Sequence, residues 1–174
     1  MDMLATSTHD TKRSEDVRAR INVLSEISDQ WRECLFRRGR QNRKLKMIVD
    51  GRPAPSRNEA YLFYQTLVAS WPFCSTTDEE FSEFRTRIKE YMLKAMPEAT
   101  VHTNWISPYL LREDAVMYFI DTILKDTAPD SFLHDFASFQ KSTAARNICN
   151  NYVFHFQTFF RCFPLLCWNL LTVL

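Results

Sequence analysis

Glycine is scarce in this chain, with only Gly39 and Gly51 among 174 residues. Hairpin-rich β architecture needs residues that accept positive φ at its turns, so this scarcity favours helices. A P-loop and a dinucleotide-binding fingerprint each need closely spaced glycines, which two isolated glycines cannot supply. The sequence therefore predicts a mainly α-helical chain without a glycine-rich phosphate-binding loop.

Charge of one sign and paired cysteines are also lacking. The 22 basic and 21 acidic residues give a formal net charge of +1, which does not point to nucleic acid or to a membrane surface. The five cysteines are odd in number and lack the spacing of a metal site, so we expect free thiols, no metal and no cofactor. No signal peptide is apparent at the N-terminus, and we expect a cytoplasmic protein.

Capping residues predict a series of helices across residues 14–146. Lys46 to Arg57 interrupt the series with Asp50-Gly51 and two prolines, and we expect a loop there. Pro97 should end the helix that Thr77 begins, and the helix after Pro108 should run to about Lys125. Helix starts are expected at Ser14, Ser28-Asp29, Ser56, Thr77, Ser107-Pro108 and Asp130-Ser131.

The last 28 residues differ from the rest, because Arg161 is the single charged residue after Asn147. A membrane-spanning helix needs roughly 20 uninterrupted apolar residues. Polar residues and Pro164 interrupt the candidate window, so we expect a buried helix or an aberrant terminus and no membrane span. The aromatic tail could also mediate self-association.

The N-terminal segment is the richest in chemistry. A short apolar lead runs into a hydroxyl-rich turn, then into His9-Asp10 and Lys12-Arg13, and then into an acidic helix start. This order is typical of the end of a buried strand, a polar loop and the first turn of a helix. A strand end that presents an imidazole, a carboxylate and two cations is the layout of a site in a barrel enzyme.

The run from Thr8 to Ile21 closely resembles a signature segment of malto-oligosyltrehalose synthases, members of the α-amylase superfamily (glycoside hydrolase family 13). Further similar segments follow in order, so the resemblance covers roughly residues 3–146 and is far more specific than a short motif. These segments begin at Asn22, Val49, Glu59, Arg87, His102 and Phe132.

The resemblance implies the helical insertion of a (β/α)8-barrel enzyme. Residues 1–13 would end barrel strand seven and form the active-site loop, residues 14–146 would be the helical insertion, and residues 147–174 an atypical apolar tail. Asp10 would be the third carboxylate, which supports the oxocarbenium-like transition state, and His9 would hydrogen-bond the same sugar ring.

Three further residues have open roles in binding a maltooligosaccharide. Lys12 and Arg13 would either contact sugar hydroxyls or orient the carboxylates of the site, or they would form ion pairs with Glu15 and Asp16. Trp105, like Tyr109, offers a stacking face for glucose, although aromatic residues at helix starts are more often packing anchors. The basic run 37–46 and the pair His134-Asp135 are interpreted as solvated surface rather than as nucleic-acid or catalytic sites.

The reaction implied by the resemblance is an intramolecular transglycosylation that turns the reducing-end α-1,4 linkage of a maltodextrin into an α,α-1,1 linkage. Retaining chemistry needs a nucleophile and a general acid about 5 Å apart, and in the family both come from earlier barrel strands. We therefore expect a fragment, truncated or frameshifted after about Arg146, that is inactive alone. The alternative is a non-catalytic helical interaction or carbohydrate-binding protein derived from the enzyme.

Overall fold

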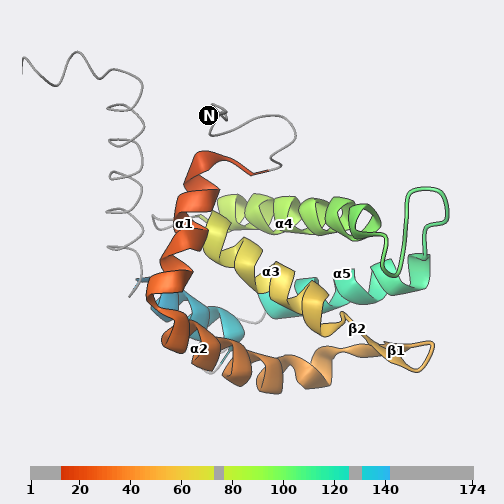
Figure 1. Ribbon diagram of the computed structural model, residues 1–174, viewed down its shortest axis with the longest axis horizontal. Helices are drawn as coiled ribbons and strands as arrows, with labels where there is room; N and C mark the ends of the chain where they lie inside the picture. The colour runs from red at the N-terminus through yellow and green to blue at the C-terminus, as the bar shows by residue number, and fades with distance from the viewer. Residues whose placement is uncertain (1–12, 73–76, 126–130, 142–174) are drawn as a thin grey trace, which may run out of the picture.

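The computed structural model describes residues 13–72, 77–125 and 131–141, and within these ranges the chain is mainly helical, as predicted (Figure 1). The expected strand remnant at the N-terminus and the apolar tail lie outside the described residues. Residues 132–141 are helical in addition to the named elements. The labelled helices and strands, in chain order, are α1 (Glu15–Glu26), α2 (Ser28–Gln41), the 3₁₀ helix η2 (Asn42–Leu45), β1 (Met47–Val49), β2 (Arg52–Ala54), α3 (Arg57–Ser70), α4 (Asp78–Ala99) and α5 (Leu110–Lys125).

The predicted helix caps at Ser14, Ser56 and Thr77 are confirmed. The Ser14 side chain accepts a hydrogen bond from the backbone N–H of Val17 at the start of α1. Ser56 with Glu59 and Thr77 with Glu80 form complete capping boxes at the starts of α3 and α4. Each box satisfies two backbone N–H groups that a helix start otherwise leaves without partners.

Two predicted helix limits are wrong. Helix α4 continues past Pro97 to Ala99 and ends at Thr100, whose backbone is left-handed. Proline there removes only one hydrogen bond of the last turn, where the helix is about to end anyway. Helix α5 begins at Leu110 rather than Pro108, because the Asn104 side chain accepts the N–H groups of Ile106 and Ser107 and holds this stretch in a loop.

The loop expected between Lys46 and Arg57 contains a short antiparallel hairpin instead. Met47 pairs with Ala54, and Val49 pairs with Arg52. Asp50 and Gly51 both have positive φ, at 49° and 70°. An Asp-Gly pair in this conformation forms the two-residue turn that matches the twist of paired strands. The turn signal was therefore present in the sequence, but strands of three residues are too short for a visible alternation.

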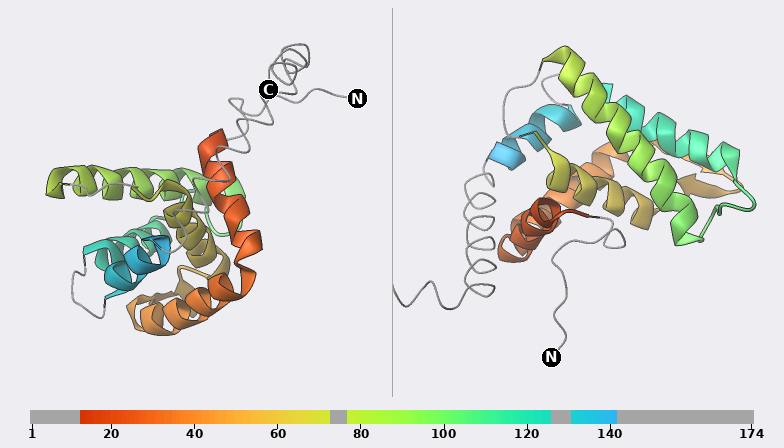
Figure 2. Two further views of the ribbon diagram at one scale, coloured as in Figure 1. Left: turned by 90° about the vertical axis from the view of Figure 1, so that its left-hand side faces the viewer. Right: turned by 90° about the horizontal axis from the view of Figure 1, so that it is seen from above.

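Helix α3 lies between α1, α4 and α5 and supplies the centre of the apolar core (Figures 1 and 2). Leu67 and Phe119 are 0% exposed, and the ring of Phe63 meets that of Phe119 edge-on at 6.1 Å. Residues 132–141 close the core from another side, where Phe136 packs 5.1 Å from Trp71. Phe132 and Phe136 of this segment are both buried.

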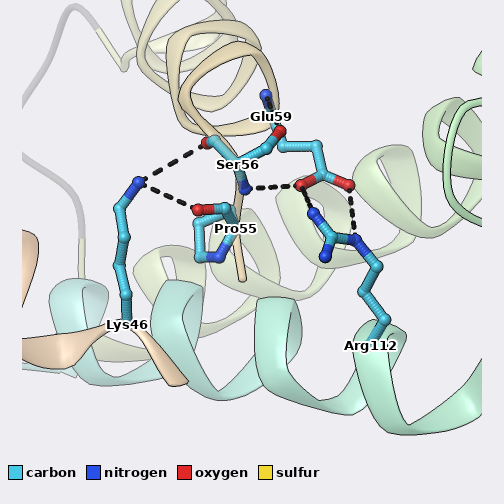
Figure 3. A network of polar contacts seen from close by, with 5 residues as sticks. All are labelled: Lys46, Pro55, Ser56, Glu59 and Arg112. Atoms are coloured by element: carbon cyan, nitrogen blue, oxygen red, sulfur yellow. Dashed lines mark hydrogen bonds and ion pairs between the residues drawn. The ribbon is translucent and has the colours of Figure 1, made fainter. Parts of the chain in front are cut away.

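A partly buried polar network joins the two residues that flank the hairpin, Lys46 and Pro55, to the start of α3 and to α5 (Figure 3). The Glu59 carboxylate accepts hydrogen bonds from the Ser56 N–H at 2.6 Å and from Arg112 at 2.7 Å. Lys46 donates to the carbonyl oxygens of Pro55, at 2.9 Å, and Ser56. Burial alone would raise the pKa of Glu59, but the hydrogen bonds from Arg112 and Ser56 outweigh it and lower the pKa.

The predicted solvated basic face is confirmed for Arg37 and wrong for Arg38. The Arg38 side chain is 1% exposed, forms an ion pair with Asp135 and lies 5.3 Å from the centre of the Phe132 ring. Asp135 therefore has a partner in the core, while its neighbour His134 is exposed as expected. Arginine can be buried at such a position because its apolar stem packs in the core while its guanidinium contacts a carboxylate and an aromatic ring.

Candidate functional site

Arg13 is the first described residue of the predicted site, since His9, Asp10 and Lys12 lie outside the described residues. Its guanidinium donates a hydrogen bond to the Tyr91 hydroxyl at 2.9 Å and lies 5.5 Å from the centre of the Tyr91 ring. Tyr91 is on α4, 78 positions further along the chain. The tertiary structure therefore anchors the chain to α4 directly after the predicted active-site loop.

A cleft of about 420 Å³ lies beside Arg13, between α1, α3 and α4. Its polar wall carries three guanidinium groups and four hydroxyl groups, and its apolar part includes Phe84 and Ile88. None of the described residues that line it is a carboxylate, so the cleft offers binding groups but no acid or base for glycoside chemistry. The lining residues are Arg13, Ser14, Val17, Arg20, Thr66, Ala69, Ser70, Phe84, Arg87, Ile88 and Tyr91.

Several polar groups of the cleft already have partners in the fold. Arg20 donates to the Trp71 carbonyl at 2.8 Å, and the hydroxyls of Thr66 and Ser70 donate to carbonyls of their own helix, α3. The Tyr91 ring lies against Arg13, so it is not a bare stacking surface. These contacts fix several side chains of the cleft within the fold, and such supporting contacts favour a defined geometry at a site.

Trp105 lies on the loop between α4 and α5 and is 63% exposed, and its neighbour Ile106 is 97% exposed. The interpretation of Trp105 as a packing anchor is therefore wrong, and its ring is open to a planar ligand. The loop beneath it is held by Thr103, which is 4% exposed, donates to Glu113 and accepts the N–H of Tyr109. Sequence reasoning missed Thr103, because a lone threonine in a polar turn gives no signal of burial.

Tyr109 has a structural role between two loops. Its hydroxyl donates a hydrogen bond to the Asp50 carboxylate in the hairpin turn, and this bond raises the pKa of Tyr109. The contact joins the start of α5 to the hairpin. Of the two aromatic residues considered for sugar stacking, Trp105 is therefore the one with an open face.

The structure does not bring Trp105 to the cleft beside Arg13. Tyr91 precedes the end of α4 at Ala99 by a stretch of helix about 12 Å long. Trp105 lies beyond that end and is not among the lining residues of the cleft. Arg13 and Trp105 could therefore serve one ligand only if that ligand is an extended chain.

The described residues contain no group of three or more His, Cys, Asp or Glu side chains suited to a metal ion. Cys34 is a free, buried thiol, and burial raises its pKa. Among the described helices, none has the length and apolar character that crossing a membrane requires. The part of the chain that the structure describes thus defines a helical unit with one hairpin and a cleft of mixed polar and apolar lining at the start of α1.

Comparisons with known proteins define its relatives. No family model matches the chain. The putative maltooligosyl trehalose synthase of Mycobacterium tuberculosis is 35% identical over 122 residues, which are 70% of this chain and 14% of that protein. Among solved structures, a crystal structure of maltooligosyl trehalose synthase matches with a TM-score of 0.66 and 33% identity over 83% of this chain and 18% of its own.

Two further solved structures agree. The hypothetical maltooligosyl trehalose synthase of Sulfolobus tokodaii gives a TM-score of 0.63 at 33% identity, covering 79% of this chain and 17% of its own. The maltooligosyltrehalose synthase from Arthrobacter ramosus gives a TM-score of 0.61 at 29% identity, and the match covers 83% of this chain and 16% of that one. The chain is homologous to maltooligosyl trehalose synthase, and it spans 14–18% of the length of these relatives. The predicted resemblance is confirmed.

Proposed function

We propose that this chain supplies the loop and helical segment that hold the reducing end of a maltodextrin in a maltooligosyl trehalose synthase. The reaction would convert the terminal α-1,4 linkage into an α,α-1,1 linkage without a cofactor, in the cytoplasm. The observation that carries the proposal is the joint match of sequence and fold, with 29–37% identity and TM-scores of 0.61–0.66 over 79–84% of the chain.

In this proposal Asp10 stabilises the transition state. Positive charge develops at the anomeric carbon as the linkage breaks, and a preorganised carboxylate lowers the energy of that state. His9 hydrogen-bonds the same ring, and Lys12 and Arg13 contact sugar hydroxyls or orient the carboxylates. The anchoring of Arg13 on Tyr91 supports these roles, because it restrains the end of the loop that carries Asp10.

Trp105 is proposed as a stacking platform for a glucose ring further along the substrate. Its exposure and its separation from Arg13 along α4 suit a chain of several linked rings. An aromatic ring packs against the apolar face of a sugar ring, and the hydroxyl groups of the sugar stay available for hydrogen bonds. Within this assignment, Arg13 contacts the reacting end and Trp105 a remote ring.

The 174 residues alone should not turn over substrate. Retaining glycoside chemistry needs a nucleophile and a general acid besides a stabilising carboxylate. The larger part of the relatives' length has no counterpart in these 174 residues. We therefore expect no loss of reducing ends when the purified chain is incubated with maltopentaose.

A chimeric enzyme tests the proposal. The matching segment of the Mycobacterium tuberculosis relative is replaced by the corresponding residues of this chain, and the loss of reducing ends of maltopentaose is followed. Trp105→Ala should raise KM and leave kcat nearly unchanged, because remote binding is lost equally in ground and transition states. Phe36→Ala is the matched control, since Phe36 is 74% exposed on α2. Equal effects of the two substitutions on KM would refute the role of Trp105.

A further inference from the structure

We propose that the surface formed by Met47, Leu110, Leu111 and Tyr118, termed here the hairpin–α5 surface, is a docking site for the remainder of a maltooligosyl trehalose synthase fold. The inference rests on the proposed function. It adds to that function an interface that none of the sugar-contact residues forms. The occupant is polypeptide, and its contacting face must be largely apolar.

The four side chains come from β1 and α5, which contact each other. Helix α5 runs inward from the side of the molecule where the hairpin lies (Figures 1 and 2). Leu111 and Tyr118 are seven residues apart on α5, with Ala115 between them, and therefore share one helix face. This face borders a second cleft, with a volume of about 520 Å³, and Met47 on β1 lines that cleft too. The exposed fractions are 47% for Met47, 65% for Leu110, 68% for Leu111 and 55% for Tyr118.

Apolar side chains gathered in this way differ from the single exposed apolar residues that are normal on a protein surface. The cleft is bordered by Lys44 and Asp114, one charge of each sign, and by the stem of Lys46. An apolar centre with a mixed polar rim is the usual composition of a protein–protein interface. A maltodextrin would need convergent hydrogen-bonding groups there, and Lys46 already donates to Pro55 and Ser56.

The occupant is indicated by the relatives. In each solved relative the matching part makes up only 16–18% of the chain, so most of that chain lies outside the match. A segment of that kind must pack against the rest of its chain, and the apolar surface left open at the hairpin and α5 is suited to that contact. The hairpin turn and α5 are also joined by the Tyr109–Asp50 hydrogen bond, so the two halves of the surface are held together.

Hydroxyl-radical labelling followed by mass spectrometry tests the proposal, because methionine and tyrosine side chains react readily when they are exposed. The labelling rates of Met47 and Tyr118 are compared between the 174-residue chain and the chimeric enzyme. We expect both rates to fall about tenfold in the chimera, as for side chains at an interface core. Phe36 on α2 is the internal reference, and its rate should stay nearly unchanged.

Substitution provides the second measurement. Leu111→Asp combined with Tyr118→Asp should leave the unfolding temperature of the 174-residue chain unchanged, because both side chains are exposed there. The same pair should lower the unfolding temperature of the chimera, whereas Phe36→Asp should not. Unchanged labelling of Met47 and Tyr118 in the chimera would overturn the proposal, as would protection that extends equally to Phe36 or a chimera that does not fold.

The outcomes separate this proposal from the proposed function. A folded chimera with protected Met47 and Tyr118 but without turnover supports the docking surface and contradicts the proposed function. An active chimera in which both side chains stay exposed supports the proposed function and contradicts the docking surface. Sugar-dependent protection of Met47 and Tyr118 in the 174-residue chain would also overturn the proposal, because it would assign the surface to the substrate.

Discussion

Replacing Glu59 by alanine should destabilise the fold far more than the same change at Glu80. Both residues complete a capping box, Glu59 at the start of α3 and Glu80 at the start of α4. Glu80 is exposed, whereas the side chain of Glu59 is 14% exposed and that of its partner Arg112 is 4% exposed. The two substitutions thus remove the same kind of cap in two environments. Only Glu59→Ala leaves a buried guanidinium, that of Arg112, without its carboxylate.

The magnitudes follow from that difference. Loss of one partner from a buried ion pair costs about 3–5 kcal/mol, because the other charge is left uncompensated. Loss of an exposed cap costs about 1 kcal/mol. Glu59→Ala should therefore lower the free energy of unfolding by about 2–4 kcal/mol more than Glu80→Ala. Arg112→Met combined with Glu59→Gln should recover much of the loss, since both charges are then removed together.

Urea unfolding at pH 7, followed by far-ultraviolet circular dichroism, measures these differences. Equal losses for Glu59→Ala and Glu80→Ala would refute the reasoning, because the Arg112 contact would then contribute nothing. The pH dependence gives an independent check. The pKa of Glu59 lies below its ordinary value of 4.5 in the folded chain, so its contribution is present above that pH and is lost on acidification. Glu59→Gln should flatten the stability profile in that acidic range.

Three further outcomes are expected. Asp135→Asn should lower the free energy of unfolding by about 2–3 kcal/mol, because buried Arg38 loses its carboxylate; Asp29→Asn, in an exposed pair with Arg32, is the control and should have little effect in the same urea titration. Stability should fall as the pH rises from about 10 to about 12, because the pKa of Tyr64 is raised to about 12 in the fold, mainly by burial. Tyr64→Phe should reduce this alkaline loss in pH-dependent unfolding, and an unchanged slope would contradict the reasoning. Trp105→Ala should leave the unfolding temperature unchanged, since that side chain is 63% exposed, and a marked drop by calorimetry would show that the ring packs in the fold.

Helix starts were predictable because their signals are local. A hydroxyl residue followed three positions later by glutamate satisfies its own backbone groups, and the boxes at Ser56 and Thr77 form as expected. Helix limits that lack such a local capping signal were less predictable. The end of α4 depends on the left-handed conformation of Thr100, and the start of α5 depends on a side-chain turn at Asn104.

Burial of charge could not be predicted from the sequence, because it depends on contacts between distant residues. Arg38 lies in a run of basic residues and has the same local pattern as its exposed neighbours. Its burial follows from Asp135 and Phe132, nearly a hundred positions away. The same holds for the Arg13–Tyr91 contact, which joins residues 78 positions apart.

The candidate site was predictable in part. The resemblance that pointed to His9 and Asp10 is confirmed as homology, while their roles, and those of Lys12, Arg13 and Trp105, stay predictions. The exposure of Trp105 favours the binding role over the packing role. Its separation from Arg13 appears only in the folded chain, because it depends on the length and direction of α4.

The effect of Asp10→Asn on kcat in the chimeric enzyme tests the central claim most directly. Asp29→Asn, the same chemical change at an exposed position of α2, serves as its control. The proposed role predicts that Asp10→Asn lowers kcat on maltopentaose by about 10²–10³ while the folded state and the Asp29→Asn rate are unchanged. A chimera that converts maltopentaose equally fast with Asp10→Asn would contradict the assignment of this chain to the reacting sugar.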